Sequence, residues 1–264
     1  VFNLNAQSYK DLWNNVNENL ENRLPESAEA FLNKIEQKAI SENNHKELLK
    51  SYLYRFKIIN QKDENPIKTS IQFAEENIGR LQEPEKSILN LAIASLYENY
   101  LNNNFFRIDR IQTTNNSNEL DIEFWDKATF ENVIESYLNK SLENAESLKK
   151  TSAESYKEIL SINDYNDEKI DYIYEPTLYD YVSHFVINYY KSYDNIKEKA
   201  LTIYQELINF DKGNNYTDAA IYNEINKLKY EYETNDNYES YINSLIKIKN
   251  ENLDNPLVTS VMAL

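Results

Sequence analysis

The segment Glu175-Pro-Thr-Leu-Tyr-Asp-Tyr-Val-Ser-His-Phe-Val-Ile-Asn-Tyr-Tyr190 decides the fold class of this chain. Its large apolar residues recur at spacings of three and four, which is the pattern of one helix face and not the alternation of a strand. These residues are Leu178, Tyr181, Val182, Phe185, Val186 and Tyr189. Pro176 is tolerated in the first turn of a helix, where its missing N–H group costs nothing. The segment therefore predicts a helix that begins at Pro176.

Similar helical patterns succeed one another along the chain with short breaks between them. They cover about residues 9–22, 25–39, 45–59, 66–78, 84–100, 126–142, 152–160, 196–210, 216–233 and 238–252. Pro25, Pro66 and Pro84 each lie where one of these helices is expected to begin. The chain has only 2 glycines in 264 residues, whereas sheet proteins of this size normally need many glycine-bearing tight turns. The sequence therefore predicts an all-α protein.

The spacing of these helices favours stacked helix pairs. Helices of about 12–18 residues joined by short connectors are typical of an α-solenoid. The first pair, with Trp13 early and Ala28, Phe31 and Ala39 later, is loosely similar to a tetratricopeptide repeat, although the expected glycine and the strict spacing are missing. We therefore predict an irregular tetratricopeptide-like α-solenoid of about ten helices with a long central loop.

We expect residues 8–253 to form a single helical domain. Residues 1–7 are more apolar than the residues after them and contain the small residue Ala6, as at the cleavage site of a signal peptide, so we expect a tail or a signal-peptide remnant there. That interpretation implies that the protein is exported. Residues 254–264 are expected to begin a further helix or a linker in a chain that is itself a fragment.

The composition excludes several classes of function. A net charge of −16 argues against nucleic-acid binding, which needs Lys and Arg to neutralise phosphates, and an anionic membrane surface would repel this chain. No apolar run is long enough to span a bilayer, so we expect no direct membrane insertion. The chain has 0 cysteines, which removes disulfides, thiolate metal sites and cysteine nucleophiles.

Asp180 and His184 are the first residues to weigh for chemistry, because they lie four apart and share one helix face. Their neighbours on that face are apolar, and no His-Glu-x-x-His motif supplies a metal site. We therefore expect a structural hydrogen bond or ion pair at the helix surface. The sequence also lacks a glycine-rich phosphate loop and a Gly-x-Ser-x-Gly motif. We predict no catalytic residue, no metal, no cofactor and no enzymatic activity.

The longest break in the helical pattern runs from Asn102 to Trp125, and loops of this length are often functional. Its aromatic ends are expected to pack against the helices. Phe105, Phe106, Arg107 and Arg110 near its start are the candidate partner-contact residues. The alternative is that the two arginines are buried or half-buried and hydrogen-bond carbonyl groups, which would anchor the loop.

Three segments together resemble the N-terminal helical region of the large alpha-2-macroglobulin family proteins of Bacteroidetes. The first is Leu48-Leu-Lys-Ser-Tyr-Leu-Tyr-Arg-Phe-Lys57. The second runs from Tyr97-Glu-Asn-Tyr100 through Asn104-Phe-Phe-Arg-Ile-Asp-Arg110 to Trp125-Asp126, and the third is Pro176-Thr-Leu-Tyr-Asp-Tyr-Val-Ser-His-Phe185. The resemblance covers most of the chain. None of the segments is a catalytic motif, so the resemblance indicates relatives and not chemistry.

The resemblance implies a secreted, often lipid-anchored protein of the periplasm or cell surface that entraps proteases. In such proteins a protease cuts a bait segment, and a Cys-Gly-Glu-Gln thioester can then capture it. This chain has no cysteine and no recognisable bait segment, so both would belong to a C-terminal remainder. The helical region is then a non-enzymatic scaffold that contacts a protein partner or the remainder of its own chain, and reaches a target protease only through other domains.

Two other interpretations stay open from the sequence. The chain could be a stand-alone tetratricopeptide-like adaptor that binds a peptide or a partner chain, or an envelope protein that binds a peptide or a glycan. A groove lined by exposed Tyr and Asn side chains would favour the adaptor. An enzyme would require a deep pocket with converging polar groups.

Overall fold

The computed structural model describes residues 7–111, 121–162, 171–192, 197–235, 237–255 and 258. Over these residues the regular elements are thirteen α-helices and three short 3-10 helices, and no β-strand is formed. The all-α prediction is therefore confirmed. The predicted helix or linker over residues 254–264, and the tail over residues 1–7, fall almost entirely outside the described residues.

Contacts divide the chain into two compact units. Unit 1 consists of Val1–Asn144 and Glu158–Tyr165, and unit 2 consists of Ala145–Lys157 and Asn166–Leu264. Both units contain several long helices and a buried interior of their own. The interpretation of residues 8–253 as a single domain stays a prediction.

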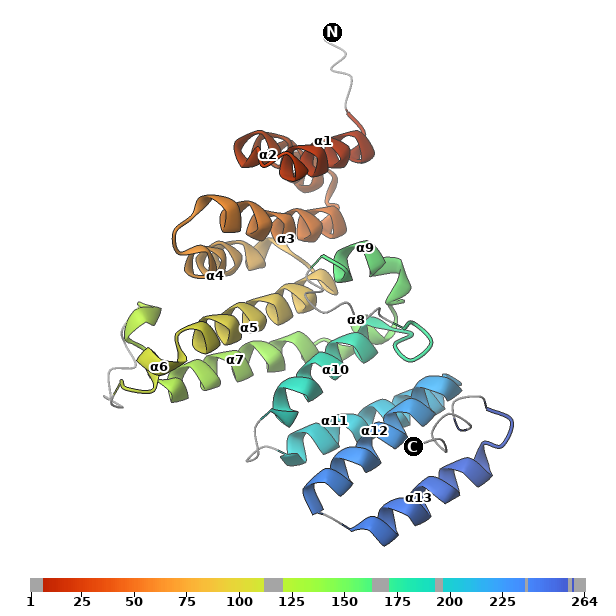
Figure 1. The fold of residues 1–264 in the computed structure, drawn as a ribbon. Helices are drawn as coiled ribbons and strands as arrows, with labels where there is room; N and C mark the ends of the chain where they lie inside the picture. Colours follow the sequence, from red (N-terminus) through yellow and green to blue (C-terminus); the bar gives the residue numbers. More distant parts are fainter. Residues whose placement is uncertain are drawn as a thin grey trace. The chain divides into compact units, whose positions relative to one another are not determined.

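Unit 1 contains the helices α1 to α7, and most of the short α9 (Lys157–Leu160) belongs to it. In order they are α1 (Tyr9–Glu21), α2 (Pro25–Glu42), α3 (His45–Lys62), α4 (Pro66–Asn77), η1 (Ile78–Arg80), α5 (Glu85–Asn103), α6 (Phe105–Ile108), η2 (Ile122–Phe124) and α7 (Lys127–Leu142). Each long helix packs mainly against the one before and the one after it, and α5 lies beside α7 (Figure 1). As predicted, Pro25 and Pro66 open α2 and α4, whereas Pro84 is the N-cap of α5.

Asparagine and aspartate occupy helix ends and turns at which other proteins often use glycine. Asn43 ends α2 in the left-handed conformation at φ 52°, and Asn215 takes φ 61°, a region that Asn tolerates better than most residues. The side chains of Asn44 and Asp126 accept hydrogen bonds from the backbone of the first turns of α3 and α7, at 3.2 Å from Glu47 N and 2.8 Å from Thr129 N. These caps explain how the chain connects its helices with so few glycines.

Replacing Asp126 with alanine is expected to lower the free energy of unfolding of unit 1 by about 1 kcal/mol, because the first N–H groups of α7 lose their acceptor. Asp126→Asn keeps a side-chain acceptor and should lose less than half of that. Chemical denaturation followed by the fluorescence of the neighbouring Trp125 measures both. Equal losses for the two variants would show that the charge, and not the cap, matters.

The interior of unit 1 has an aliphatic part and an aromatic part. The mainly aliphatic cluster joins α1, α2 and α3 and consists of Leu12, Trp13, Val16, Ala28, Leu32, Ile35 and Ile58. In the aromatic part the fully buried ring of Phe130 lies 5.6 Å from Tyr100, 5.3 Å from Trp125 and 6.4 Å from Tyr97, measured between ring centroids. The hydroxyl of Tyr97 donates to Glu75 at 2.8 Å, so the polar end of this buried ring is satisfied.

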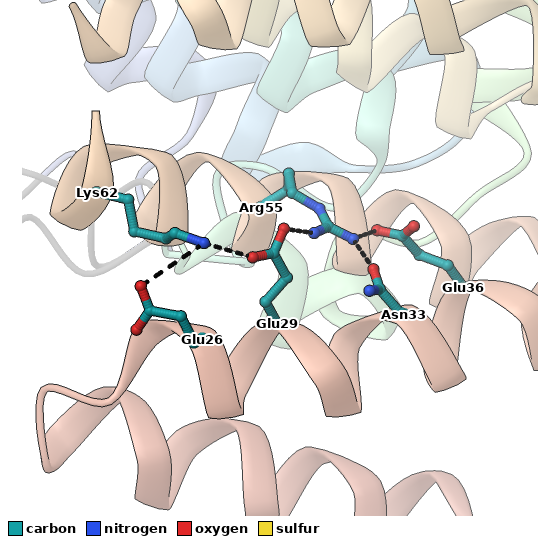
Figure 2. A network of polar contacts seen from close by, with 6 residues as sticks. All are labelled: Glu26, Glu29, Asn33, Glu36, Arg55 and Lys62. Atoms are coloured by element: carbon teal, nitrogen blue, oxygen red, sulfur yellow. Dashed lines mark hydrogen bonds and ion pairs between the residues drawn. The ribbon is translucent and has the colours of Figure 1, made fainter. Parts of the chain in front are cut away.

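A polar network crosses the interface between α2 and α3 (Figure 2). The guanidinium of Arg55, whose side chain is 9% exposed, donates to Glu29 at 2.8 Å and to Asn33 and Glu36 at 2.7 Å each. Lys62 donates to the second oxygen of Glu29 at 2.7 Å. A planar guanidinium suits several acceptors at once, so one side chain connects three positions along α2.

Unit 2 contains α8 (Ala145–Lys149), η3 (Glu154–Tyr156) and four long helices. These are α10 (Leu178–Lys191), α11 (Lys197–Gly213), α12 (Thr217–Asn235) and α13 (Tyr238–Glu251). Here too α10 packs on α11, α11 on α12 and α12 on α13, and α8 packs on α10. About ten helices were predicted, and the described residues form thirteen, of which ten are long and three, α6, α8 and α9, have five residues or fewer. The helix predicted over residues 152–160 is instead the short η3 followed by α9.

The helix predicted to begin at Pro176 begins two residues later, at Leu178. Thr177 is its N-cap in an extended conformation, and the side chains of Thr177 and Asp180 form a capping box. Residues on either side pair with an earlier segment, since Leu178 N donates to Thr151 O at 2.9 Å and Ala153 N donates to Pro176 O at 3.2 Å. Pro176 therefore lies outside the helix, because the capping box fixes the start.

Candidate functional site

The predicted partner-contact residues lie at one end of the α5–α7 pair, in the single turn of α6 and, for Arg110, two residues after it (Figure 1). The chain leaves α5 at Asn104, whose side-chain amide donates to the carbonyl oxygen of Tyr100 at 2.9 Å. Ile108 of α6 and Ile122 of η2 are buried, 1% and 7% exposed. Because these two aliphatic residues are buried, they anchor the segments before and after residues 112–120 to the rest of unit 1. Residues 112–120 themselves are not among the described ones.

Arg107 connects the segment before this break to the segment after it by hydrogen bonds. Its guanidinium donates to the carbonyl oxygen of Glu123 and to the hydroxyl of Tyr100, the latter at 3.3 Å. The anchoring role that the sequence left open therefore fits Arg107, although its side chain is exposed and not buried as that interpretation expected. Arg110 is exposed.

A second connection to the segment after the break is made by Lys68 of α4. The ammonium of Lys68 lies 2.9 Å from a carboxylate oxygen of Asp121 and 2.9 Å from one of Glu123. The hydrogen bond with Lys68 lowers the pKa of Asp121, and the hydrogen bonds with Asp121 and Glu123 raise the pKa of Lys68. The segment after the break is thus fixed both to α6 and to α4.

Three phenylalanines on these tethered segments face solvent. Phe106 is 82% exposed, Phe124 58% and Phe105 40%, and the rings of Phe105 and Phe106 lie 6.0 Å apart. We refer to these three residues as the aromatic tip. The prediction that the aromatic ends of the break are packed is wrong at this end, because the buried position of the turn is taken by Ile108. At the other end it holds for Trp125, which stacks on Tyr97 at 5.7 Å, but not for Phe124.

Asp180 is buried inside unit 2, the side chain of His184 is 13% exposed, and the two residues hydrogen-bond to other partners than each other. His184 Nδ1 lies 2.6 Å from Glu175 Oε1, and its Nε2 lies 2.6 Å from Asn223 Oδ1. Asp180 Oδ2 accepts from the Thr177 hydroxyl at 2.5 Å. The prediction of a pair at the helix surface is therefore wrong, because α11 and α12 cover this face of α10.

Asp211 and Asn223 complete this network, and neither was predicted from the sequence. Asn223 Nδ2 donates to Asp211 Oδ2 at 2.9 Å, and both residues are 0% exposed. A signal was present, since Asp211 continues the apolar stripe of α11 formed by Ile203, Leu207 and Ile208. A polar residue on a buried stripe needs a partner from another element.

A shallow groove lies on the described surface of unit 2. The groove, of about 260 Å³, lies among α11, α12 and α13. Its lysines are already engaged, since Lys212 pairs with Glu224, Lys227 with Glu231 and Lys247 with Glu251. Paired cations of this kind do not make an anion site. Within the described ranges, no group of three or more acidic or histidine side chains is arranged to hold a metal ion.

None of the described helices combines the length and the apolar character that crossing a bilayer requires. Models of known protein families gave no match to this chain, and neither did the curated proteins or the solved structures with which it was compared. The class that fold and surface define is an all-α protein of sequentially packed helices with an exposed aromatic tip. Its relation to the alpha-2-macroglobulin family stays a prediction.

Proposed function

We propose that this chain is a non-enzymatic helical scaffold whose aromatic tip makes a protein–protein contact. The observation that supports it best is the 82% exposure of Phe106 on a turn that is held in place from both sides. Aromatic side chains and arginine are enriched in the energetically important parts of protein interfaces. Arg107 already hydrogen-bonds within the chain, so we assign the apolar contact with a partner to the three phenylalanines.

The tethering of the tip favours binding. A surface that is already fixed loses less conformational freedom when a partner covers it, and more of the contact energy is then available for affinity. Full burial of one phenylalanine stabilises a complex by about 1.5–3 kcal/mol, so two or three of them can carry a moderate interface. Asp109 and Arg110, which are exposed beside the tip, would lie at the rim of such an interface.

The partner that we propose is the C-terminal remainder of the same polypeptide, in an alpha-2-macroglobulin-like protease-trapping protein of the cell envelope. The proposal rests on the resemblance of the three segments and on the helix-after-helix packing, which is the packing that a tetratricopeptide-like solenoid would have. In this proposal the protein is exported to the periplasm or cell surface, with or without a lipid anchor. A target protease is reached through the remaining domains.

Two experiments test this proposal. The reading frame past Leu264 should encode macroglobulin domains, and a frame that ends there would contradict it. If the remainder exists, mixing it with this chain in a calorimeter should show binding, and Phe106→Ala with Phe124→Ala should weaken it at least about thirtyfold. Tyr238→Ala removes another exposed aromatic ring, 65% exposed on α13, and should leave the affinity unchanged. Equal loss in both variants would assign the contact to a different surface.

A further inference from the structure

Six polar side chains from four segments converge inside unit 2. Glu175 and Thr177 precede α10, Asp180 and His184 lie on α10, Asp211 lies on α11 and Asn223 on α12. Asp180, Asp211 and Asn223 are each 0% exposed, and Thr177 is 2% exposed. Burying two carboxyl groups together is unfavourable unless their charges and hydrogen bonds are compensated. The hydrogen-bond donors next to the two carboxyl groups determine how the cost of burying them is compensated.

The protein supplies donors for only one oxygen of each carboxyl group. Asp180 Oδ2 accepts from Thr177 N at 3.0 Å and from the Thr177 hydroxyl at 2.5 Å. Asp211 Oδ2 accepts from Asn223 Nδ2 at 2.9 Å. The Oδ1 atoms of Asp180 and Asp211 are both buried with no donor among the described groups. Each carboxyl group acts on the other through a side-chain hydrogen bond, so one proton held between them can satisfy both.

The same geometry assigns the charge of His184. Asp211 needs a donor, so the amide of Asn223 must turn its Nδ2 toward Asp211 and its Oδ1 toward His184. The other ring nitrogen of His184 faces a carboxylate oxygen of Glu175. Both ring nitrogens therefore meet acceptors, which requires both to carry a proton. His184 is an imidazolium that balances Glu175, and the carboxyl pair is left with one proton and one negative charge.

We propose that Asp180 and Asp211 form a proton-sharing latch that holds α10 against α11 and releases them when the shared proton is lost. Once both carboxyl groups are ionised, two negative charges face each other away from water, and the packed arrangement becomes costly. The latch is part of unit 2 alone and does not depend on the function proposed for the aromatic tip.

The surrounding charges do not offset the second ionisation. Lys149 of α8 lies over the rings of Tyr179 and Phe210, 4.9 and 5.6 Å from their centroids. Glu206 of α11 accepts from the Tyr179 hydroxyl at 3.4 Å. Lys212 of α11 is paired with Glu224 of α12. Among the described residues, the cation next to the pair is His184, and it is already balanced by Glu175.

The pH dependence has a definite sign. Burial, followed by the charge of Asp180, raises the pKa of Asp211 from an ordinary 3.8 to about 8, and burial also raises the pKa of Asp180. Burial opposes the charge of His184, but the hydrogen bond and charge of Glu175 outweigh it and raise its pKa. Groups whose pKa is raised on folding contribute stability that is complete below their unfolded pKa and is lost as pH rises through the folded pKa. Unit 2 should therefore loosen progressively as pH rises toward about 8 and change little above it.

Hydrogen exchange followed by mass spectrometry tests this, with rates corrected for the intrinsic effect of pH. Between about pH 6.5 and about pH 8, exchange in peptides from α10 and α11 should rise by up to about tenfold per pH unit and then level off at higher pH, while peptides from α2 and α3 stay unchanged. Asp211→Asn carries no charge and can donate to Asp180, so it should reduce the rise to less than about twofold. Asp254→Asn, at an exposed position, should keep the full rise. No rise in the unmodified protein, or an equal rise in Asp211→Asn, would overturn the proposal.

A measurement on the unmodified protein covers the case in which Asp211→Asn does not fold. Carbon-13 spectra of the aspartate carboxyl groups should show one proton still shared by two buried residues at about pH 6.5, with titration near pH 8. If every aspartate carboxyl group is ionised by about pH 6, the shared proton does not exist and the latch is refuted.

Discussion

Phe130→Ala is expected to lower the free energy of unfolding of unit 1 by about 3–5 kcal/mol, a larger effect than that of any other substitution proposed for this protein. The ring is 0% exposed and lies at the centre of an aromatic cluster on α5 and α7. Truncating it removes the buried apolar surface and leaves a cavity, because Tyr97, Tyr100 and Trp125 cannot all move inward. A typical domain has only about 5–15 kcal/mol of stability, so this loss is a large fraction.

Urea denaturation followed by the fluorescence of Trp125, which contacts the Phe130 ring, measures the effect directly. Phe106→Ala is the matched control. It removes the same side chain from a position that is 82% exposed, and it should change stability by no more than about 0.5 kcal/mol. A loss below about 1.5 kcal/mol for Phe130→Ala would mean that the cluster between α5 and α7 is not a tightly packed interior.

Arg55→Ala is expected to cost about 2–4 kcal/mol, somewhat below the usual effect of removing one partner from a fully buried pair. Glu29 and Glu36, 33% and 19% exposed, would be left without the guanidinium that spans them, and Asn33 would lose its donor (Figure 2). Arg55 also lies over the ring of Phe73, with 5.8 Å from its Cζ to the ring centroid, so packing is lost together with charge.

Two further variants separate the geometry of the guanidinium from its charge. Arg55→Lys keeps the charge but cannot reach three acceptors at once, so it should recover less than half of the loss. Lys127→Ala removes one partner of a pair that is 47% and 34% exposed on α7, and it should cost at most about 0.5 kcal/mol. Full recovery by Arg55→Lys would contradict the role given to the planar guanidinium. Chemical denaturation monitored at Trp13 provides the measurement.

The two units should respond to pH in opposite directions. In unit 1, the hydrogen bond from Lys62, and then the charges of Lys62 and Arg55, outweigh burial and hold the pKa of Glu29 below its ordinary 4.5. A lowered pKa contributes stability that is present above the unfolded pKa and is lost as pH falls through the folded one. The contact between α2 and α3 is therefore sensitive to acid, whereas the Asp180–Asp211 latch is sensitive to base.

The helices of this chain were predictable because local signals determine them. Pro25, Pro66 and the Asn43-Asn44 pair mark helix boundaries that the structure confirms, and the three- and four-residue spacing of apolar residues located the helix faces. Pro176 shows where such signals fail. A capping box between Thr177 and Asp180 overrides the general preference for proline in the first turn and moves the start of α10 to Leu178.

The side-chain networks were not predictable in the same way, because they join residues that are distant in sequence. Asp180 gave no sign that its neighbour would be Asp211, and only their shared burial where α10, α11 and α12 pack makes the pair meaningful. At the aromatic tip, the sequence indicated Phe105 and Phe106 as candidate partner-contact residues but also predicted that the aromatic ends of the break are packed. Which residue of a single helical turn is buried depends on the tertiary contacts of Ile108, and spacing alone cannot decide that.

The central claim, that the aromatic tip is a protein-contact surface, is tested most directly by hydroxyl-radical footprinting of Phe106 and Phe124. The measurement compares the 264-residue chain with the whole gene product. We predict that oxidation of these two rings, which are 82% and 58% exposed, falls at least about fivefold in the whole protein, while oxidation of the exposed Tyr238 stays the same. Equal oxidation of the tip in both proteins would contradict the proposed contact.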